Sequence, residues 1–128
     1  MQPHYFSLDE ANAALEVIRP LIEEILAIRD RVLKQQPEVW PAIERSAGNG
    51  GNARLSRIAA DFGRLDELVH RVVDTGVQVK DINTGLLDFP AWHGDHEVYL
   101  CWKYGEAKIL YWHEIEAGFS GRQSIDGF

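Results

Sequence analysis

The sequence predicts an α+β protein in which a long antiparallel helical hairpin, residues 1–75, precedes a small antiparallel β-meander, residues 76–128. Three observations predict this class. In two stretches of the first part, apolar residues recur at intervals of three and four, the period of amphipathic helices. A segment rich in glycine and asparagine, residues 46–52, separates the two stretches as a loop does. Beyond Gly76 the pattern changes to the alternation typical of strands.

The first helix is expected to span Leu8–Gln35. Ser7 and Glu10 stand at the positions of a capping box, in which each side chain accepts a hydrogen bond from the other residue's backbone amide. Pro20 lies inside the helix, and because the apolar pattern continues in phase across it, we expect a bend there and not an end. The apolar stripe consists of Leu15, Ile18, Leu21, Ile22, Ile25, Ile28, Val32 and Leu33.

Residues 37–45 fit either a short helix or an irregular extension of the first one. After the loop, a second long helix is expected from Asn52 to Asp74. Gly76 is a suitable stop for it, because glycine readily adopts the left-handed conformation that ends helices.

The second part is expected to form a strand at 77–82, a turn at 83–85 and a short strand at 86–89 that Pro90 ends. Two further strands are expected at 96–103 and 107–114, and coil after Ile115.

Tyr104 and Gly105 predict a two-residue hairpin loop between the last two strands. In that register apolar side chains collect on one face, whereas a three-residue loop with a glycine bulge would place charged side chains among them. The two-residue loop makes His96 and His113 directly opposed cross-strand partners.

The composition indicates one soluble domain spanning residues 1–128. The net charge is −7, which disfavours nucleic acid and anionic membrane surfaces as partners. Cys101 is the single cysteine, so an intrachain disulfide is excluded, and a small buried side chain is the expected role for it. The first residues lack the pattern of a signal peptide, and a cytoplasmic location is the expectation.

Histidines and carboxylates are concentrated in the second part. His96 and His113 with Asp88 or Glu114 would form a set of two histidines and one carboxylate for a divalent metal such as zinc, iron, nickel or manganese, and Asp81 is a further candidate ligand. The alternative interpretation is structural: histidines that bond to neighbours at a sheet edge, and aspartates that cap turns. Neither a metal cofactor nor an enzymatic reaction follows from these residues alone.

Three stretches resemble a known family, and so does the N-terminal segment FSLDEAN at 6–12. The stretches are KDINTGLLDFP at 80–90, VYLCWKYGE at 98–106 and WHEIEAGFSGRQ at 112–123. The chain resembles over nearly its whole length the bacterial and archaeal family filed as domain of unknown function 2203. The resemblance implies no stated activity. It implies a polar site with His113 as its single histidine, consisting of Asp81, Asp88, Glu106, His113, Glu114 and Arg122.

Two functional hypotheses follow. The first is a binding or interaction protein that acts as a homodimer through its helices, because helix faces with both Leu21 and Ile22, or both Leu68 and Val69, are wide for a two-helix hairpin. The second is a metal-dependent enzyme or metal-binding protein with His113 and a carboxylate in the β-meander.

Overall fold

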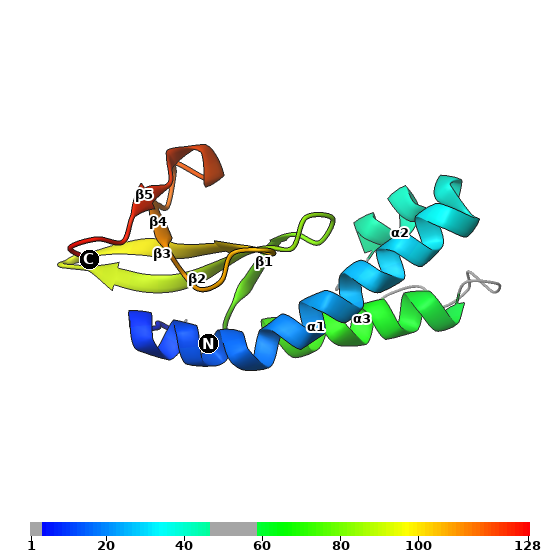
Figure 1. The fold of residues 1–128 in the computed structure, drawn as a ribbon, viewed down its shortest axis with the longest axis horizontal. Coiled ribbons are helices and arrows are strands. Elements are labelled where there is room, and N and C mark those ends of the chain that lie inside the picture. The colour runs from blue at the N-terminus through cyan, green and yellow to red at the C-terminus, as the bar shows by residue number, and fades with distance from the viewer. Residues whose placement is uncertain (1–3, 47–58) are drawn as a thin grey trace.

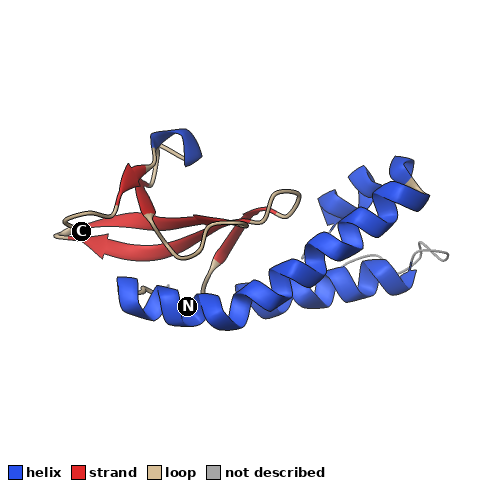
Figure 2. Cartoon of the chain, in the orientation of Figure 1, coloured by secondary structure: helices blue, strands red, loops and turns tan. Residues whose placement is uncertain are grey.

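A computed structural model describes residues 4–46 and 59–128 of the chain (Figure 1). Helices come first and a five-stranded antiparallel sheet follows, in the order β1-β2-β3-β4-β5, so the α+β class is confirmed. Figure 2 shows how the helices and the strands occupy different parts of the molecule. The elements are α1 (Leu8–Gln35), the 3-10 helix η1 (Pro37–Val39), α2 (Trp40–Ser46), α3 (Ala59–Val73), β1 (Gln78–Asp81), β2 (Leu86–His93), β3 (His96–Lys103), β4 (Tyr111–Glu114), the 3-10 helix η2 (Phe119–Gly121) and β5 (Gln123–Ser124).

The first helix has the predicted bounds and the predicted start. The Ser7 side chain accepts from the Glu10 amide at 3.0 Å, and the Glu10 carboxylate accepts from the Ser7 amide at 2.8 Å. Pro20 lies within α1 and the helix continues past it, which confirms that this proline does not end the helix. The stripe is buried at Leu15, Ile18, Ile22, Ile25, Ile28 and Val32.

The third helix packs beside the second half of α1. Arg64 pairs with Glu24, and Arg31 pairs with Asp61, so residue numbers rise along one helix as they fall along the other. The expected uninterrupted hairpin is nevertheless not confirmed. A short helix, α2, follows α1, as one of the two interpretations of residues 37–45 required, and the predicted loop and the start of the second helix fall in 47–58, outside the described residues.

The apolar faces that were expected to need a second chain are covered in part within one chain, although Leu21 is only half-buried and Leu33 is exposed. Ile22, Leu68 and Val69 are all buried in a single core cluster that the helices share with the sheet. The homodimer stays a prediction.

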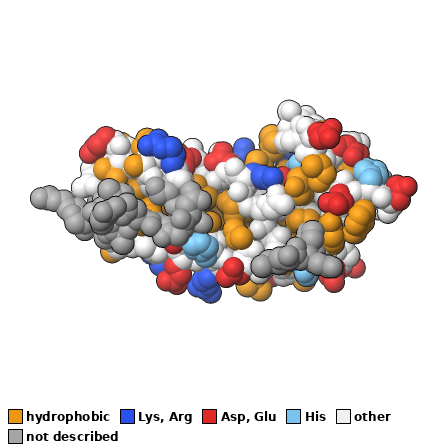
Figure 3. Space-filling model, turned by 180° about the vertical axis from the view of Figure 1, so that it is seen from behind, with side chains coloured by type: hydrophobic (Ala, Val, Ile, Leu, Met, Phe, Trp, Pro, Cys, Tyr) orange, Lys and Arg blue, Asp and Glu red, His pale blue; other side chains and the backbone are white. Residues whose placement is uncertain are grey.

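One face of the molecule carries its charges in a dispersed way. On the face in Figure 3, the basic side chains drawn in colour stand apart from one another, and acidic side chains lie around them. Within the described ranges, no helix combines the length and the apolarity needed to cross a bilayer.

Strand β2 runs through Pro90 to His93, which corrects the prediction that Pro90 ends it. The carbonyl of Pro90 accepts from the Phe6 amide at 2.8 Å, on the side away from β3. Because the amide and the carbonyl of one residue in an antiparallel strand point to the same side, the missing N–H of Pro90 faces the N-terminal segment and costs the β2–β3 ladder nothing.

The pairing of β3 with β4 differs from the predicted hairpin. Leu100 lies opposite Trp112 and Tyr99 lies opposite His113, so His96 and His113 are not partners. The connection covers residues 104–110, the strand begins only at Tyr111, and a short β5 follows where coil was expected.

Long-range contacts of residues 104–110 explain the longer connection. The Ile109 amide donates to the Asn12 side chain at 2.9 Å, and Arg19 donates to the Ala107 carbonyl at 2.6 Å. Both partners lie on α1, so this segment leaves the sheet to pack on the helix and buries Ile109 there. The pattern of the two strands contains no information about this contact with α1.

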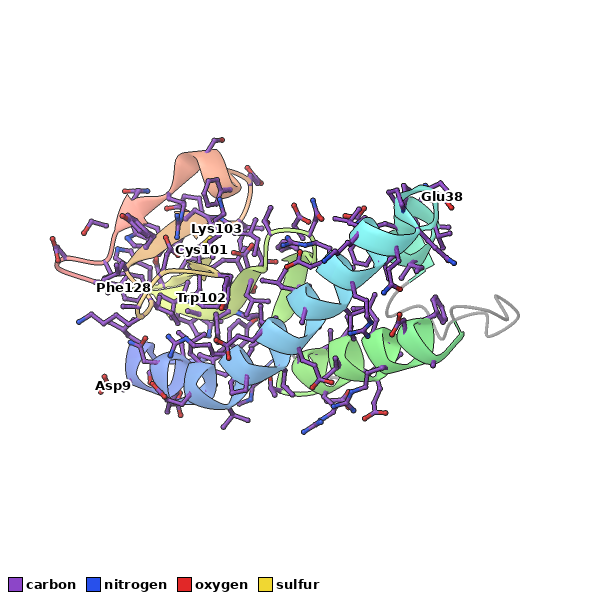
Figure 4. All side chains as sticks on the ribbon, turned by 45° about the vertical axis from the view of Figure 1, so that its right-hand side comes forward. Asp9, Glu38, Cys101, Trp102, Lys103 and Phe128 are labelled. Atoms are coloured by element: carbon purple, nitrogen blue, oxygen red, sulfur yellow. The ribbon has the colours of Figure 1, made fainter. Side chains whose placement is uncertain are left out.

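The sheet has two different faces. The inner face packs on α1 and contains Leu87, Phe89, Val98, Leu100 and Trp102, all buried. Alternation along the strands places Asp88, Tyr99, Cys101 and His113 on the opposite side, which we call the outer face. In Figure 4, Trp102 lies toward α1, whereas Cys101 and Lys103 lie toward the C-terminal segment.

Candidate functional site

Two buried polar side chains meet on the outer face. Nε2 of His113, on β4, lies 3.0 Å from Oδ1 of Asp88, on β2. Asp88 is opposite Cys101 and His113 is opposite Tyr99, so the two side chains reach each other across β3. Their exposed fractions are 3% and 2%, and they are the buried polar pair of the described core. A pair so fully removed from water is held by its mutual hydrogen bond.

The second ring nitrogen defines the protonation of this pair. Nδ1 of His113 lies 2.8 Å from the backbone carbonyl of Glu114, which can only accept a hydrogen bond. Nδ1 therefore carries a hydrogen, and the contact between Nε2 and Asp88 needs one more. The pair is either an imidazolium beside a carboxylate or a neutral imidazole beside a carboxylic acid, with one shared proton in both cases.

Cys101 completes the cluster. One ligand atom each from Asp88, Cys101 and His113 lie within 4.8 Å of one another, and all three residues are buried. Burial raises the pKa of the Cys101 thiol to about 12, and the charge of Asp88 acts in the same direction. The thiol is thus protonated at neutral pH. The expected burial of Cys101 is confirmed, but its contact with Asp88 was not predicted.

A pocket of about 180 Å³ opens onto the pair. Tyr99 forms one wall with its ring centroid 5.5 Å from that of His113, and the ammonium group of Lys80 lies 4.8 Å above the Tyr99 ring. The pocket is lined by Lys80, Leu86, Asp88, Tyr99, His113, Ile115, Gly118 and Phe119. Cys101 is not among the lining residues, so the thiol lies behind the pair and the pocket in front of it.

Glu106 and Arg122 form a separate pair. The guanidinium of Arg122 donates to both carboxylate oxygens of Glu106, at 2.6 and 2.7 Å, and lies between the rings of Tyr111 and Phe119. This arrangement ties residues 104–110 to the C-terminal segment. Its role is to hold the wall that carries Phe119.

The other candidates have structural partners. Asp81 accepts from the Asn83 amide at 2.8 Å and so caps the turn after β1. Glu114 lies 3.1 Å from the imidazole of His96, at the end of the sheet. The structure thus brings together Asp88 and His113 out of the six residues of the predicted polar site, and it does not place Asp81 or His96 with them.

A signal for the contact of Cys101 with Asp88 was present in the sequence. Gly94 and Asp95 make a two-residue turn, and counting back from it through both strands pairs Asp88 with Cys101. The prediction that Pro90 ends the strand concealed this register. Tyr99 and Lys80 were missed for a different reason, since their proximity to His113 depends on the β3–β4 pairing.

The comparisons with known proteins give one match. The family model described as uncharacterised conserved protein (DUF2203) matches residues 4–125. No curated protein and no solved structure matches the chain. The match covers almost the entire chain, including every residue of the buried cluster and of the pocket in front of it. The protein therefore belongs to the DUF2203 family of uncharacterised conserved proteins.

Proposed function

We propose that the protein binds a divalent metal ion, with zinc the best match, through Asp88, Cys101 and His113. The observation that carries this proposal is the 3.0 Å contact between Nε2 of His113 and Oδ1 of Asp88 at the floor of a pocket. A proton occupies the space between these two atoms. A metal ion bound to both would take its place.

The distances support two ligands on one ion. Zinc binds imidazole nitrogen at about 2.0–2.1 Å and carboxylate oxygen at about 2.0–2.2 Å, so the two donor atoms of one tetrahedral site lie about 3.3–3.5 Å apart, a few tenths of an ångström more than the 3.0 Å between Nε2 and Oδ1. Histidines that bind metals usually donate their other N–H to a carbonyl or carboxylate, and His113 does so to Glu114. This bond orients Nε2 toward the site.

The third ligand determines the choice of metal. A thiolate beside an imidazole and a carboxylate favours zinc over magnesium or calcium, which prefer oxygen. The Cys101 thiol, with its pKa of about 12, gives up its proton only to an ion that binds the sulfur directly. Three protein ligands leave one position of a tetrahedral zinc open, as in catalytic zinc sites, and here that position would face the pocket.

A metal titration tests the proposal. The full chain is treated with chelator and dialysed, and zinc and cobalt(II) are then added while binding and absorption are recorded. We expect one ion per chain and, for cobalt, the charge-transfer absorption of a thiolate ligand. H113Q is expected to lose binding, and C101S is expected to keep weaker binding without the thiolate band.

The matched control is H70Q. His70 is a half-exposed histidine on α3, paired with Asp66 and remote from the outer face, so its replacement leaves the metal affinity unchanged. Circular dichroism checks the fold of each variant. Absence of stoichiometric binding by the wild type, or equal binding by H113Q and H70Q, would overturn the proposal.

The predicted homodimer and the uninterrupted helical hairpin also stay proposals. The antiparallel pairing of α1 with α3 supports the hairpin. A mass measurement by light scattering over a wide range of concentrations tests the dimer: a constant 14.5 kDa particle would contradict it.

A further inference from the structure

We propose that the outer face binds a small organic carboxylate, with the carboxylate group beside Lys80 and an apolar body along Leu86 and Phe119. The inference rests on the pocket of the proposed metal site and specifies the class of ligand that this pocket takes. It does not need the metal to be present, so the two ideas can fail separately.

The space is larger than the pocket over His113 alone. A second pocket of about 240 Å³ has Leu86 and Phe119 as walls, and both residues also line the first. The two pockets therefore adjoin along these side chains, and we call them together the outer trough. Its second part is lined by Asp81, Thr84, Leu86, Lys103 and Phe119.

The charges place an anion in the first part of the trough. Asp88 is hydrogen-bonded to His113, and Lys80 is the lysine among the residues that line that part. In the second part Lys103 and Asp81 offset each other. An anionic group beside Lys80 and a neutral body beside Lys103 and Asp81 is the arrangement that this distribution favours.

Lys80 is free to receive a ligand. Among the residues that the structure describes, no carboxylate forms an ion pair with it, and its ammonium lies over the Tyr99 ring. Most arginines of the same described ranges, such as Arg64 and Arg122, are engaged with carboxylates. In a protein with a net charge of −7, an unpaired lysine over a pocket is a local attraction for an anion.

The apolar walls account for the body of the ligand. Phe119 and Ile115 are large apolar side chains with exposed fractions of 42% and 41%, and both line the trough. Leu86 continues this surface between the two parts. Apolar walls with a few polar groups are characteristic of sites for small organic molecules.

A carboxylate fits better than a phosphate. One ammonium group matches one negative charge, and the guanidinium of Arg122, which lies 4.6 Å from the Phe119 ring, is already bound to Glu106. Phosphate groups are usually recognised by arginines or by several backbone amides. No arginine is among the residues that line the two parts of the trough.

The test is a titration of the metal-free full chain followed by NMR. Benzoate is the probe, benzamide is its neutral counterpart and phenyl phosphate is its doubly charged counterpart. We expect benzoate to shift the amide signals of residues 80, 99 and 119, and to bind about tenfold more tightly than benzamide, the difference expected for one charge-assisted hydrogen bond.

The variants are K80Q and K108Q. Lys108 is also exposed but lines neither part of the trough, so it is the matched control. We expect K80Q to bind benzoate about tenfold more weakly and benzamide as before, and K108Q to match the wild type in both. F119A is expected to weaken both probes.

Each contrary result overturns the inference. No binding of any probe removes the site. Equal affinity for benzoate and benzamide, or an unchanged affinity of K80Q for benzoate, would show that the site does not recognise a carboxylate. Tighter binding of phenyl phosphate than of benzoate would show that the ligand is a phosphate. Repeating the titration with added zinc separates the two proposals. If benzoate binds and zinc does not, the carboxylate site stands and the metal site is disproved. If zinc binds and benzoate does not, the metal site stands and the carboxylate site is disproved.

Discussion

The helical part and the sheet of this protein each hold a pair of charged side chains, one at the surface and one buried. On the helices, Arg64 pairs with Glu24 at the surface, with 39% and 42% of the two side chains exposed. In the sheet, His113 pairs with Asp88 almost out of contact with water. Water screens the surface pair, so losing one of its members changes the stability little. In the buried pair each side chain depends on the other alone, so losing one member is costly.

The largest effect is expected from a charge placed in the core that both parts share. Ile25 of α1 is buried, and I25E would leave a carboxylate there without a partner, at a cost of several kcal/mol in order of magnitude. We expect I25E to be largely unfolded by circular dichroism. V17E is the control, since Val17 is mostly exposed on the same helix, and it is expected to fold normally. A well-folded I25E would show that the core tolerates this charge.

The next effect comes from the buried pair itself. D88A leaves His113 without its partner and is expected to lower the free energy of unfolding by about 3–5 kcal/mol, as measured by urea denaturation. The double variant D88A/H113A should lose less than the sum of the two single variants, because neither partner is left alone. Additive losses would mean that the hydrogen bond contributes no coupling between the two residues.

The sheet should also protect its cysteine. Burial raises the pKa of Cys101 from 9.0 to about 12, so at pH 8 the thiolate fraction is about a thousandfold lower in the folded protein than in the unfolded chain. We expect iodoacetamide to modify native Cys101 more slowly by at least that factor. The folded protein also holds the thiol proton more tightly than the unfolded chain does. Cys101 therefore makes its full contribution to the free energy of unfolding below pH 9, and this contribution declines as the pH rises toward 12. Comparable rates in native protein and in urea would contradict this expectation.

The smallest effect is expected from the surface pair. R64A removes the contacts of Arg64 with Glu24 and Glu67, and should change the free energy of unfolding by about 0–1 kcal/mol. Adding salt should reduce this difference further. If R64A lowered the free energy of unfolding as much as D88A does, the surface pair and the buried pair would not differ in their contribution to stability.

The polar site could be predicted in part. Asp88 and His113 were both candidates, but alternation along β4 places Glu114 on the other face, where it lies beside His96. The error was the register of β3 with β4. Moving the partner of His113 from His96 to Tyr99 is a shift by an odd number of residues, which turns every side chain of β4 to the opposite face of the sheet.

The sequence by itself determined the features that depend on near neighbours in the chain. The capping box starts α1 at Leu8, the apolar phase carries the helix past Pro20, and Gly85 ends the turn after β1 with a positive φ of 70°. These choices depend on interactions within a few residues, so the local pattern contains all the information they need.

Only the tertiary structure decided how the strands pair and what the outer face holds. Asn12 on α1 binds the Ile109 amide, and this contact across 97 positions removes residues 107–110 from the strand. The pairing that remains brings His113 beside Asp88 and leaves Cys101 behind them. Strand alternation restricts a residue to one of two faces, but the energy that selects the face comes from packing on a helix far away in the chain.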